Sequence, residues 1–120
     1  MTRILVVGGG RMGNALVGGL LRSGWIEPHD LAVTELRAEG RAELEQRYPG
    51  VRVAEGPVET ESAVLAVKPP DAEPGTRVVV ESGAHRMVSI VAGVPLAALE
   101  RWAGDGVAVL RAMPNMPTFW

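Results

Sequence analysis

Residues 4–13 read ILVVGGGRMG, and this stretch decides the fold. Its four aliphatic residues follow one another without polar alternation, which is typical of a strand buried on both faces of a parallel sheet. The six residues from Gly8 to Gly13 satisfy the pattern G-x-G-x-x-G, and the apolar spacing of residues 12–22 predicts a helix directly after it. A buried strand, a glycine-rich turn and a helix in this order predict a loop that binds phosphate groups at the N-terminus of the helix.

The glycines of the pattern have separate steric roles. Gly8 permits the tight turn after the strand, Gly10 lets the backbone approach a pyrophosphate, and Gly13 allows the helix to pack closely on the strand. The free amides and the dipole at the start of the helix favour an anion there. We therefore expect a dinucleotide cofactor, NADP or NAD, to contact the loop and its flanks, namely Val7, Gly8, Gly9, Gly10, Arg11, Met12 and Gly13.

The rest of the chain alternates between apolar runs and helical patterns. Strands are predicted at residues 31–33, 51–53, 63–67, 87–91 and 107–110, and helices at residues 38–48, 71–83 and 95–102. Gly24 is expected to end the first helix, and the Pro74-Gly75 pair to interrupt the third. The alternation predicts an α/β protein with a Rossmann-type, doubly wound, mostly parallel sheet of about six strands and helices on both faces. We expect residues 1–111 to form this single dinucleotide-binding domain.

Two charged residues follow the second predicted strand and bear on the choice of cofactor. Glu35 lies roughly 20 residues after Gly13, the separation expected of the acid that binds an adenosine ribose. A carboxylate there favours the free 2′-hydroxyl of NAD, whereas Arg37 would pair with the 2′-phosphate of NADP. The two residues indicate opposite cofactors, and a third interpretation is that both only begin a charged surface helix. The sequence therefore leaves NAD and NADP open.

Composition excludes several classes of function. The chain has 120 residues, a formal net charge of −2 and no cysteine, so we expect no disulfide, no thiolate metal site and no nucleic-acid partner. His29 and His85 lie far apart without the spacing of metal ligands, so no metal is expected. No apolar run reaches the length of a membrane span or of a signal-peptide core. We therefore expect a cytoplasmic protein without a membrane partner.

Three later segments make the pattern more specific. Residues 66–69 read AVKP, residues 89–94 read SIVAGV and residues 111–117 read RAMPNMP, and each lies at the carboxyl end of a predicted strand. Together with the glycine loop, and in this order along nearly the whole chain, they resemble the signature of pyrroline-5-carboxylate reductases. The resemblance implies that further cofactor contacts come from Ala66, Val67, Lys68, Ala92, Gly93 and Asn115.

The resemblance also implies an activity, the NAD(P)H-dependent reduction of 1-pyrroline-5-carboxylate to L-proline in proline biosynthesis. No residue of this chain is expected to be catalytic, because the reaction asks the protein mainly for positioning and electrostatics. Members of the family continue into a helical domain that forms the dimer and holds most of the substrate. We therefore expect residues 112–120 to be a tail leading towards that domain, which is absent from this sequence, and the 120-residue chain to be monomeric and inactive alone.

Two alternatives stay open at this point. One is another dehydrogenase of the F420-dependent, prephenate or β-hydroxyacid group, which share the same opening domain. The Val-Lys-Pro and Met-Pro-Asn-x-Pro segments weigh against it. The other is a stand-alone module that binds NAD(P) without turnover.

Overall fold

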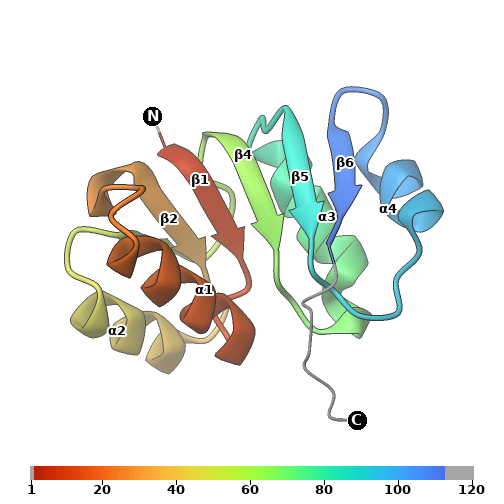
Figure 1. The fold of residues 1–120 in the computed structure, drawn as a ribbon. Coiled ribbons are helices and arrows are strands. Elements are labelled where there is room, and N and C mark those ends of the chain that lie inside the picture. Colours follow the sequence, from red (N-terminus) through yellow and green to blue (C-terminus); the bar gives the residue numbers. More distant parts are fainter. Residues whose placement is uncertain (1, 113–120) are drawn as a thin grey trace, which may run out of the picture.

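The computed structural model describes residues 2–112, which form one six-stranded sheet between helices (Figure 1). The strand order is β3-β2-β1-β4-β5-β6, and every neighbouring pair is parallel. The order reverses between β1 and β4, so the carboxyl ends of these two strands mark the switch point at which such sheets bind ligands. The strands are β1 (Thr2–Val7), β2 (Leu31–Thr34), β3 (Arg52–Ala54), β4 (Thr60–Leu65), β5 (Arg86–Ser89) and β6 (Ala108–Arg111).

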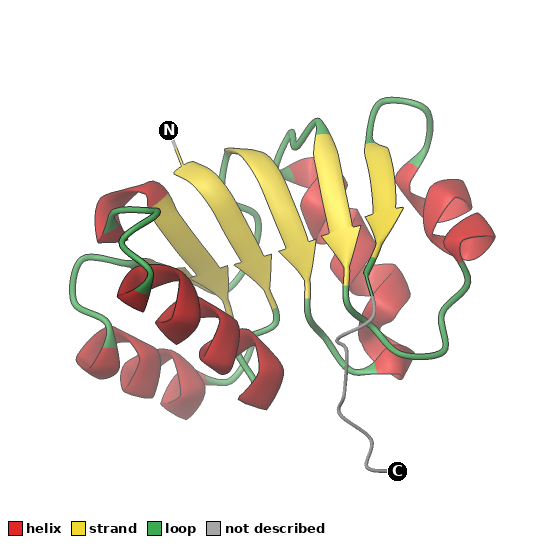
Figure 2. Cartoon of the chain, in the orientation of Figure 1, coloured by secondary structure: helices red, strands yellow, loops and turns green. Residues whose placement is uncertain are grey.

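Helices cover both faces of the sheet, which confirms the doubly wound α/β fold that the sequence predicts (Figure 2). Helices α1 and α2 lie against one face, and α3 and α4 lie against the other. Among residues 2–112, no helix has the length and apolarity to cross a membrane. The helices are α1 (Arg11–Arg22), α2 (Ala38–Arg47), α3 (Ala72–Glu81) and α4 (Leu96–Ala103), and short 3-10 turns occur at η1 (Pro28–Asp30) and η2 (Pro69–Asp71).

Strand β1 is the centre of the molecule because its two faces supply two separate cores. Leu5 and Val7 pack into the core under α3 and α4, whereas Val6 packs into the core under α1 and α2. All three side chains are buried, and a fully buried side chain of this size contributes about 1.5–3 kcal/mol to stability. Burial on both faces explains why this strand reads as an unbroken apolar run.

Two predicted strands end earlier than their apolar runs suggested. The run of residues 63–67 predicted a strand through Val67, but β4 ends at Leu65 and begins three residues sooner, at Thr60. Likewise β5 ends at Ser89, although Ile90 and Val91 continue the apolar run. The reason is that Val91 is buried in a core after the strand has ended, so its apolar character reflects packing of a loop and not pairing in the sheet. The other strands lie within two residues of their predicted bounds at each end.

The predicted interruption of the third helix at Pro74-Gly75 is wrong, because α3 continues through both residues. Pro74 is the third residue of the helix, where a backbone N–H has no acceptor within the helix and its loss costs nothing. Gly75 lets the helix approach β4, since a Cβ atom there would lie 2.7 Å from Cδ1 of the buried Leu65. Gly24 does end the first helix as expected, with a φ of +74° directly after the C-cap Ser23.

The close approach at Gly75 gives a prediction about stability. Gly75→Val should lower the free energy of unfolding by about 1–3 kcal/mol, because the new side chain overpacks the contact with Leu65. The matched control is Gly19→Ala in α1, where a Cβ atom meets no heavy atom within 4 Å, and a gain of about 0.5–1 kcal/mol is expected. Urea denaturation of both variants measures the difference. Equal stability of the Gly75→Val variant and the parent chain would show that α3 does not need this close contact.

Candidate functional site

The glycine loop joins β1 to α1 and is held between the ends of two other strands. The Gly8 amide donates a hydrogen bond to the Thr34 carbonyl at the end of β2, at 3.2 Å. Gly8 has a φ of +107°, and a Cβ atom there would lie 2.8 Å from Val67 Cγ1 and 2.9 Å from the Ala66 carbonyl oxygen. Both the backbone angle and the space therefore require glycine at this position.

Gly13 and Gly10 lie on opposite sides of the loop: Gly13 on the inner side, which packs on the protein, and Gly10 on the outer side, which is open. A Cβ atom at Gly13 would collide with the carbonyl oxygen of Gly8, so the first turn of α1 packs directly on the loop backbone. At Gly10, the N-cap of α1, no heavy atom lies within 4 Å of a Cβ position. The outer side is therefore open, as a backbone that receives a ligand requires.

The start of α1 has the electrostatic character of an anion site. The first helical hydrogen bond runs from the Asn14 amide to the Gly10 carbonyl, at 2.8 Å, which leaves the amides of residues 11–13 without an acceptor in the helix. The first turn of α1 contains no acidic residue, and the side chains of Arg11 and Met12 are exposed. The free amides, the helix dipole and the absence of a carboxylate in this turn favour a phosphate group.

Val7 has a different position from the other predicted loop residues. Its side chain is 3% exposed and packs into the core under α3 and α4. Its carbonyl oxygen accepts a hydrogen bond from the Ala66 amide, at 2.9 Å, one residue beyond the end of β4. Val7 thus fixes the base of the loop from beneath and presents no side chain to the open side.

Glu35 lies against the glycine loop, at the end of β2, and its carboxylate is buried. A Cβ atom at Gly9 would lie 3.0 Å from Glu35 Cβ, and one at Gly40 would lie 2.8 Å from Glu35 Cγ. The side chain therefore fills a narrow space between the loop and the first turn of α2, with only 9% of it exposed. Its Oε2 atom accepts hydrogen bonds from the Arg37 backbone amide, at 2.9 Å, and from Arg37 Nε, at 3.0 Å.

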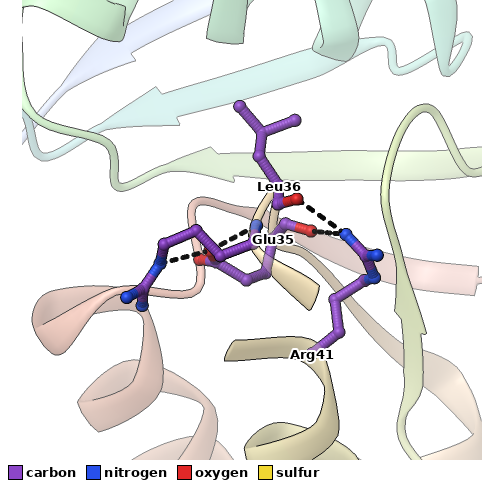
Figure 3. A network of polar contacts seen from close by, with 4 residues as sticks. Glu35, Leu36 and Arg41 are labelled. Atoms are coloured by element: carbon purple, nitrogen blue, oxygen red, sulfur yellow. Dashed lines mark hydrogen bonds and ion pairs between the residues drawn. The ribbon is translucent and has the colours of Figure 1, made fainter. Parts of the chain in front are cut away.

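Arg41 is part of the same polar network, and the sequence reasoning missed it. Its Nη1 atom donates hydrogen bonds to the carbonyl oxygens of Glu35, at 3.0 Å, and Leu36, at 2.8 Å (Figure 3). Arg41 is the fourth residue of α2, and Arg37 is the N-cap of the same helix. The partners of Arg41 are backbone carbonyl oxygens, so no sequence signal identifies them.

The loops after β4 and β5 reach the same edge of the sheet as the glycine loop. Ala66 is 8% exposed and packs beside Gly8, whereas Lys68 is exposed at the start of η2. Ala92 and Gly93 form an exposed turn, and the φ of +76° at Gly93 favours glycine there. The structure thus brings Ala66 and Val67 into contact with the glycine loop, and the other predicted residues of these loops lie at the same edge. Asn115 lies outside the described residues.

Two depressions elsewhere on the described surface have a different character. One lies at the amino end of β4 and is lined by Glu59, Glu61, Glu81 and His85. Its carboxylates would repel a pyrophosphate. The other lies beside Trp25, against the strands β4 and β5. Neither contains a residue of the glycine loop, whose affinity for an anion comes from its backbone geometry and its free amides.

Comparisons with known proteins show which enzymes the chain is similar to. The chain is 38% identical over 126 residues to a pyrroline-5-carboxylate reductase of Mycobacterium tuberculosis. The matched region covers 96% of this chain and 42% of the relative. It is 34% identical over 132 residues to the enzyme of the same name from Corynebacterium melassecola, covering 98% of this chain and 46% of the relative. The chain thus spans less than half the length of these relatives.

Solved structures give the same result for the fold. A pyrroline-5-carboxylate reductase from Coxiella burnetii superposes with a TM-score of 0.82 and 28% identity, covering 97% of this chain and 45% of the other. A pyrroline carboxylate reductase from Plasmodium falciparum, solved with NADP bound, superposes with a TM-score of 0.75 and 21% identity, covering 95% and 42%. The model of one protein family, described as NADP oxidoreductase, coenzyme F420-dependent, matches residues 3–93, three quarters of the chain, and the chain belongs to this family.

Proposed function

We propose that this chain is the cofactor-binding half of a pyrroline-5-carboxylate reductase and that it binds NADPH or NADH at the carboxyl edge of its sheet. The observation that carries the proposal is the glycine loop. Gly8 and Gly13 admit no side chain, Gly10 leaves its outer side open, and the amides at the start of α1 have no acceptor in the helix. The similarity to reductases of this name along 96% of the chain supports the same reading.

Different residues of the site would contact different parts of the cofactor. The amides of the glycine loop would hold the pyrophosphate, and the end of β2, with Glu35 and Arg37, would receive the adenosine ribose. The loops after β4 and β5 would line the nicotinamide half through Ala66, Val67, Lys68, Ala92 and Gly93, joined by Asn115. The loop supplies backbone donors of fixed direction, which orient the cofactor without moving.

The proposed reaction is the reduction of the C=N bond of 1-pyrroline-5-carboxylate to give L-proline. When bound, the nicotinamide supplies the hydride for the imine carbon, and the imine nitrogen carries a proton from solvent. A protonated imine is already electrophilic, so what this chain contributes is the position of the cofactor. We assign no side chain of this chain as an acid or base.

The proposal extends to how the chain behaves alone. Residues 1–111 would form the cofactor domain, and residues 112–120 would be a tail that leads towards the part of the family by which the relatives are longer than this match. By the resemblance, that part holds most of the substrate and forms the dimer. We propose that the 120-residue chain is a cytoplasmic monomer that binds cofactor without turning over the substrate.

Gly10 provides the test of cofactor binding. Gly10→Val should weaken the binding of NADPH and NADH by roughly 10- to 100-fold, because the side chain fills the space of the pyrophosphate and removes charge-assisted hydrogen bonds. The same change should leave the melting temperature close to that of the parent, because Gly10 has a φ of −75° and free space around its Cβ position. Calorimetric titration and a thermal melt measure the two quantities.

The control for this titration is the Gly19→Ala variant, which lies nine residues after Gly10, inside α1, and is equally free of neighbours around its Cβ position. It should bind both dinucleotides as the parent chain does. If the folded parent chain binds neither dinucleotide, or if Gly10→Val binds both as well as the parent, the glycine loop is not a pyrophosphate site.

A second prediction concerns the chain as a whole. The purified 120-residue protein should elute as one species near its mass of 12.7 kDa and should show no oxidation of NADPH in the presence of 1-pyrroline-5-carboxylate. The reason is that no residue of this chain is proposed to hold the substrate. Size-exclusion chromatography with light scattering and an absorbance assay measure both. A substrate-dependent rate proportional to protein concentration would show that the chain holds a whole active site.

A further inference from the structure

The first turn of α1 is held from outside the glycine loop by the residue that ends the neighbouring helix. Tyr48 is the C-cap of α2, and its hydroxyl donates a hydrogen bond to Asn14 Oδ1, at 2.8 Å. The same hydroxyl lies 3.2 Å from the Asn14 carbonyl oxygen, and Arg47 Nη1 donates to Asn14 Oδ1 at 3.3 Å. Helices α1 and α2 lie on the same face of the sheet (Figure 1), and these contacts join the end of α2 to the beginning of α1.

Asn14 in turn holds the open side of the loop. Its backbone amide donates the first helical hydrogen bond, to the Gly10 carbonyl oxygen at 2.8 Å. That carbonyl shares a peptide plane with the Arg11 amide, the first of the amides that have no acceptor in the helix. The direction in which this amide points at a bound anion therefore depends on where Asn14 lies.

Two glycines make room for α2 against the loop and its helix. A Cβ atom at Gly18, one turn after Asn14, would lie 2.9 Å from the Tyr48 hydroxyl oxygen. A Cβ atom at Gly9 would lie 2.7 Å from Cδ1 of Leu44, which is buried one turn before Tyr48. The half-buried ring of Tyr48 packs against the core that contains Leu44, so the position of its hydroxyl is fixed by packing.

From these contacts we infer that Tyr48 is a positioning residue for the anion site, acting through Asn14 on the amides at the start of α1. The inference rests on the proposed function, since it assumes that those amides hold the pyrophosphate of a dinucleotide. Hydrogen bonds weaken steeply as their angle departs from linear, so a small displacement of the helix start weakens several of them together. Because NADPH and NADH share the pyrophosphate, Tyr48 acts equally on the binding of both.

The experiment is a calorimetric titration of the 120-residue chain with NADPH and with NADH, together with a thermal melt. Tyr48→Phe keeps the ring in the core and removes only the hydroxyl that reaches Asn14. It should weaken the binding of both dinucleotides by the same factor, roughly 3- to 10-fold, which corresponds to the loss of about one hydrogen bond. The melting temperature should fall by a few degrees for the same reason.

Gly18→Ala separates an effect on binding from an effect on stability. Alanine favours a helix more than glycine does, but its methyl group would displace the Tyr48 hydroxyl from Asn14. The variant should therefore weaken the binding of both dinucleotides by a factor similar to that of Tyr48→Phe. The double variant should bind as Tyr48→Phe alone does, because the hydroxyl is already absent. Gly19→Ala is the control at the next residue, where a Cβ atom meets no heavy atom within 4 Å, and it should bind as the parent does.

The matched control for the loss of a hydroxyl is Ser82→Ala. Ser82 is the C-cap of α3, and its Oγ atom donates to the Val78 carbonyl oxygen at 2.7 Å and accepts from the Val58 amide at 3.1 Å. Its carbonyl oxygen accepts the Thr60 amide at the amino end of β4, at the edge of the sheet opposite the glycine loop. Ser82→Ala should lower the melting temperature at least as much as Tyr48→Phe and leave both affinities unchanged.

Each other outcome has a distinct meaning. Unchanged affinities in a Tyr48→Phe variant that melts at a lower temperature overturn the inference, because the hydroxyl would then serve stability alone. An equal loss of affinity in Ser82→Ala, a loss confined to one dinucleotide, or factors that multiply in the double variant overturn it as well. If Tyr48→Phe does not fold, unchanged affinities in Gly18→Ala overturn it instead. Failure of the folded parent chain to bind either dinucleotide overturns the proposed function and the inference with it.

Discussion

The fit of the glycine loop between strand ends is the constraint on which the rest of the structure depends. The amide of Gly8 is bonded to the end of β2, and its Cα faces the residues that follow β4 at less than the distance a side chain needs. Gly13 then brings α1 onto the carbonyl oxygen of Gly8. A side chain at Gly8 would push the loop away from the residues that follow β4, and one at Gly13 would push α1 away from the loop. Because β1 supplies residues to both cores, the loop sets how α1 leaves the strand on which both cores depend.

The same crowding extends from the loop to α2 through a single side chain. Glu35 fills the space that the missing side chains of Gly9 and Gly40 leave. Two glycines far apart in the sequence are therefore both needed to accommodate one side chain. The carboxylate is shielded from solvent and is satisfied by Arg37, in keeping with the rule that buried charges are paired and hydrogen-bonded. The position of an exposed arginine at the mouth of the site thus depends on the packing of the loop beneath it.

The sequence predicted those parts of the fold that depend on local pattern. An apolar run followed by G-x-G-x-x-G and a helix predicted β1, the loop and α1, and the alternation of elements predicted the doubly wound sheet, because both signals follow from backbone geometry. The ends of β4 and β5 were predicted too late because Ala66 and Val91 are buried for tertiary reasons that an apolar run does not reveal. The interruption at Pro74 was wrong because the effect of proline depends on its position in the helix, and that position depends on where η2 ends.

The candidate site was predictable to the same extent. The glycine loop and Glu35 were predicted because their spacing is fixed by the βαβ unit. The direction of the Glu35 carboxylate was not, because it depends on Gly40, which the sequence places inside a helix with no sign of a role. Arg41 was missed for a related reason. Its partners are the backbone carbonyl oxygens of Glu35 and Leu36, which carry no signature in a sequence.

Whether a contact comes from the backbone or from a side chain also determines whether this domain is able to distinguish one dinucleotide from another. The loop from Gly8 to Gly13 offers amides, which recognise the pyrophosphate that all dinucleotides share and therefore carry no preference among them. Discrimination between cofactors requires side chains, and the predicted contacts that carry side chains stand at the start of α1, at the end of β2 and after β4 and β5. The relatives match along nearly the whole chain, yet more than half of their own length lies beyond the match. On the proposed function, the groups at the end of β2 bear on which cofactor is used, and no residue among residues 2–112 is assigned to the substrate.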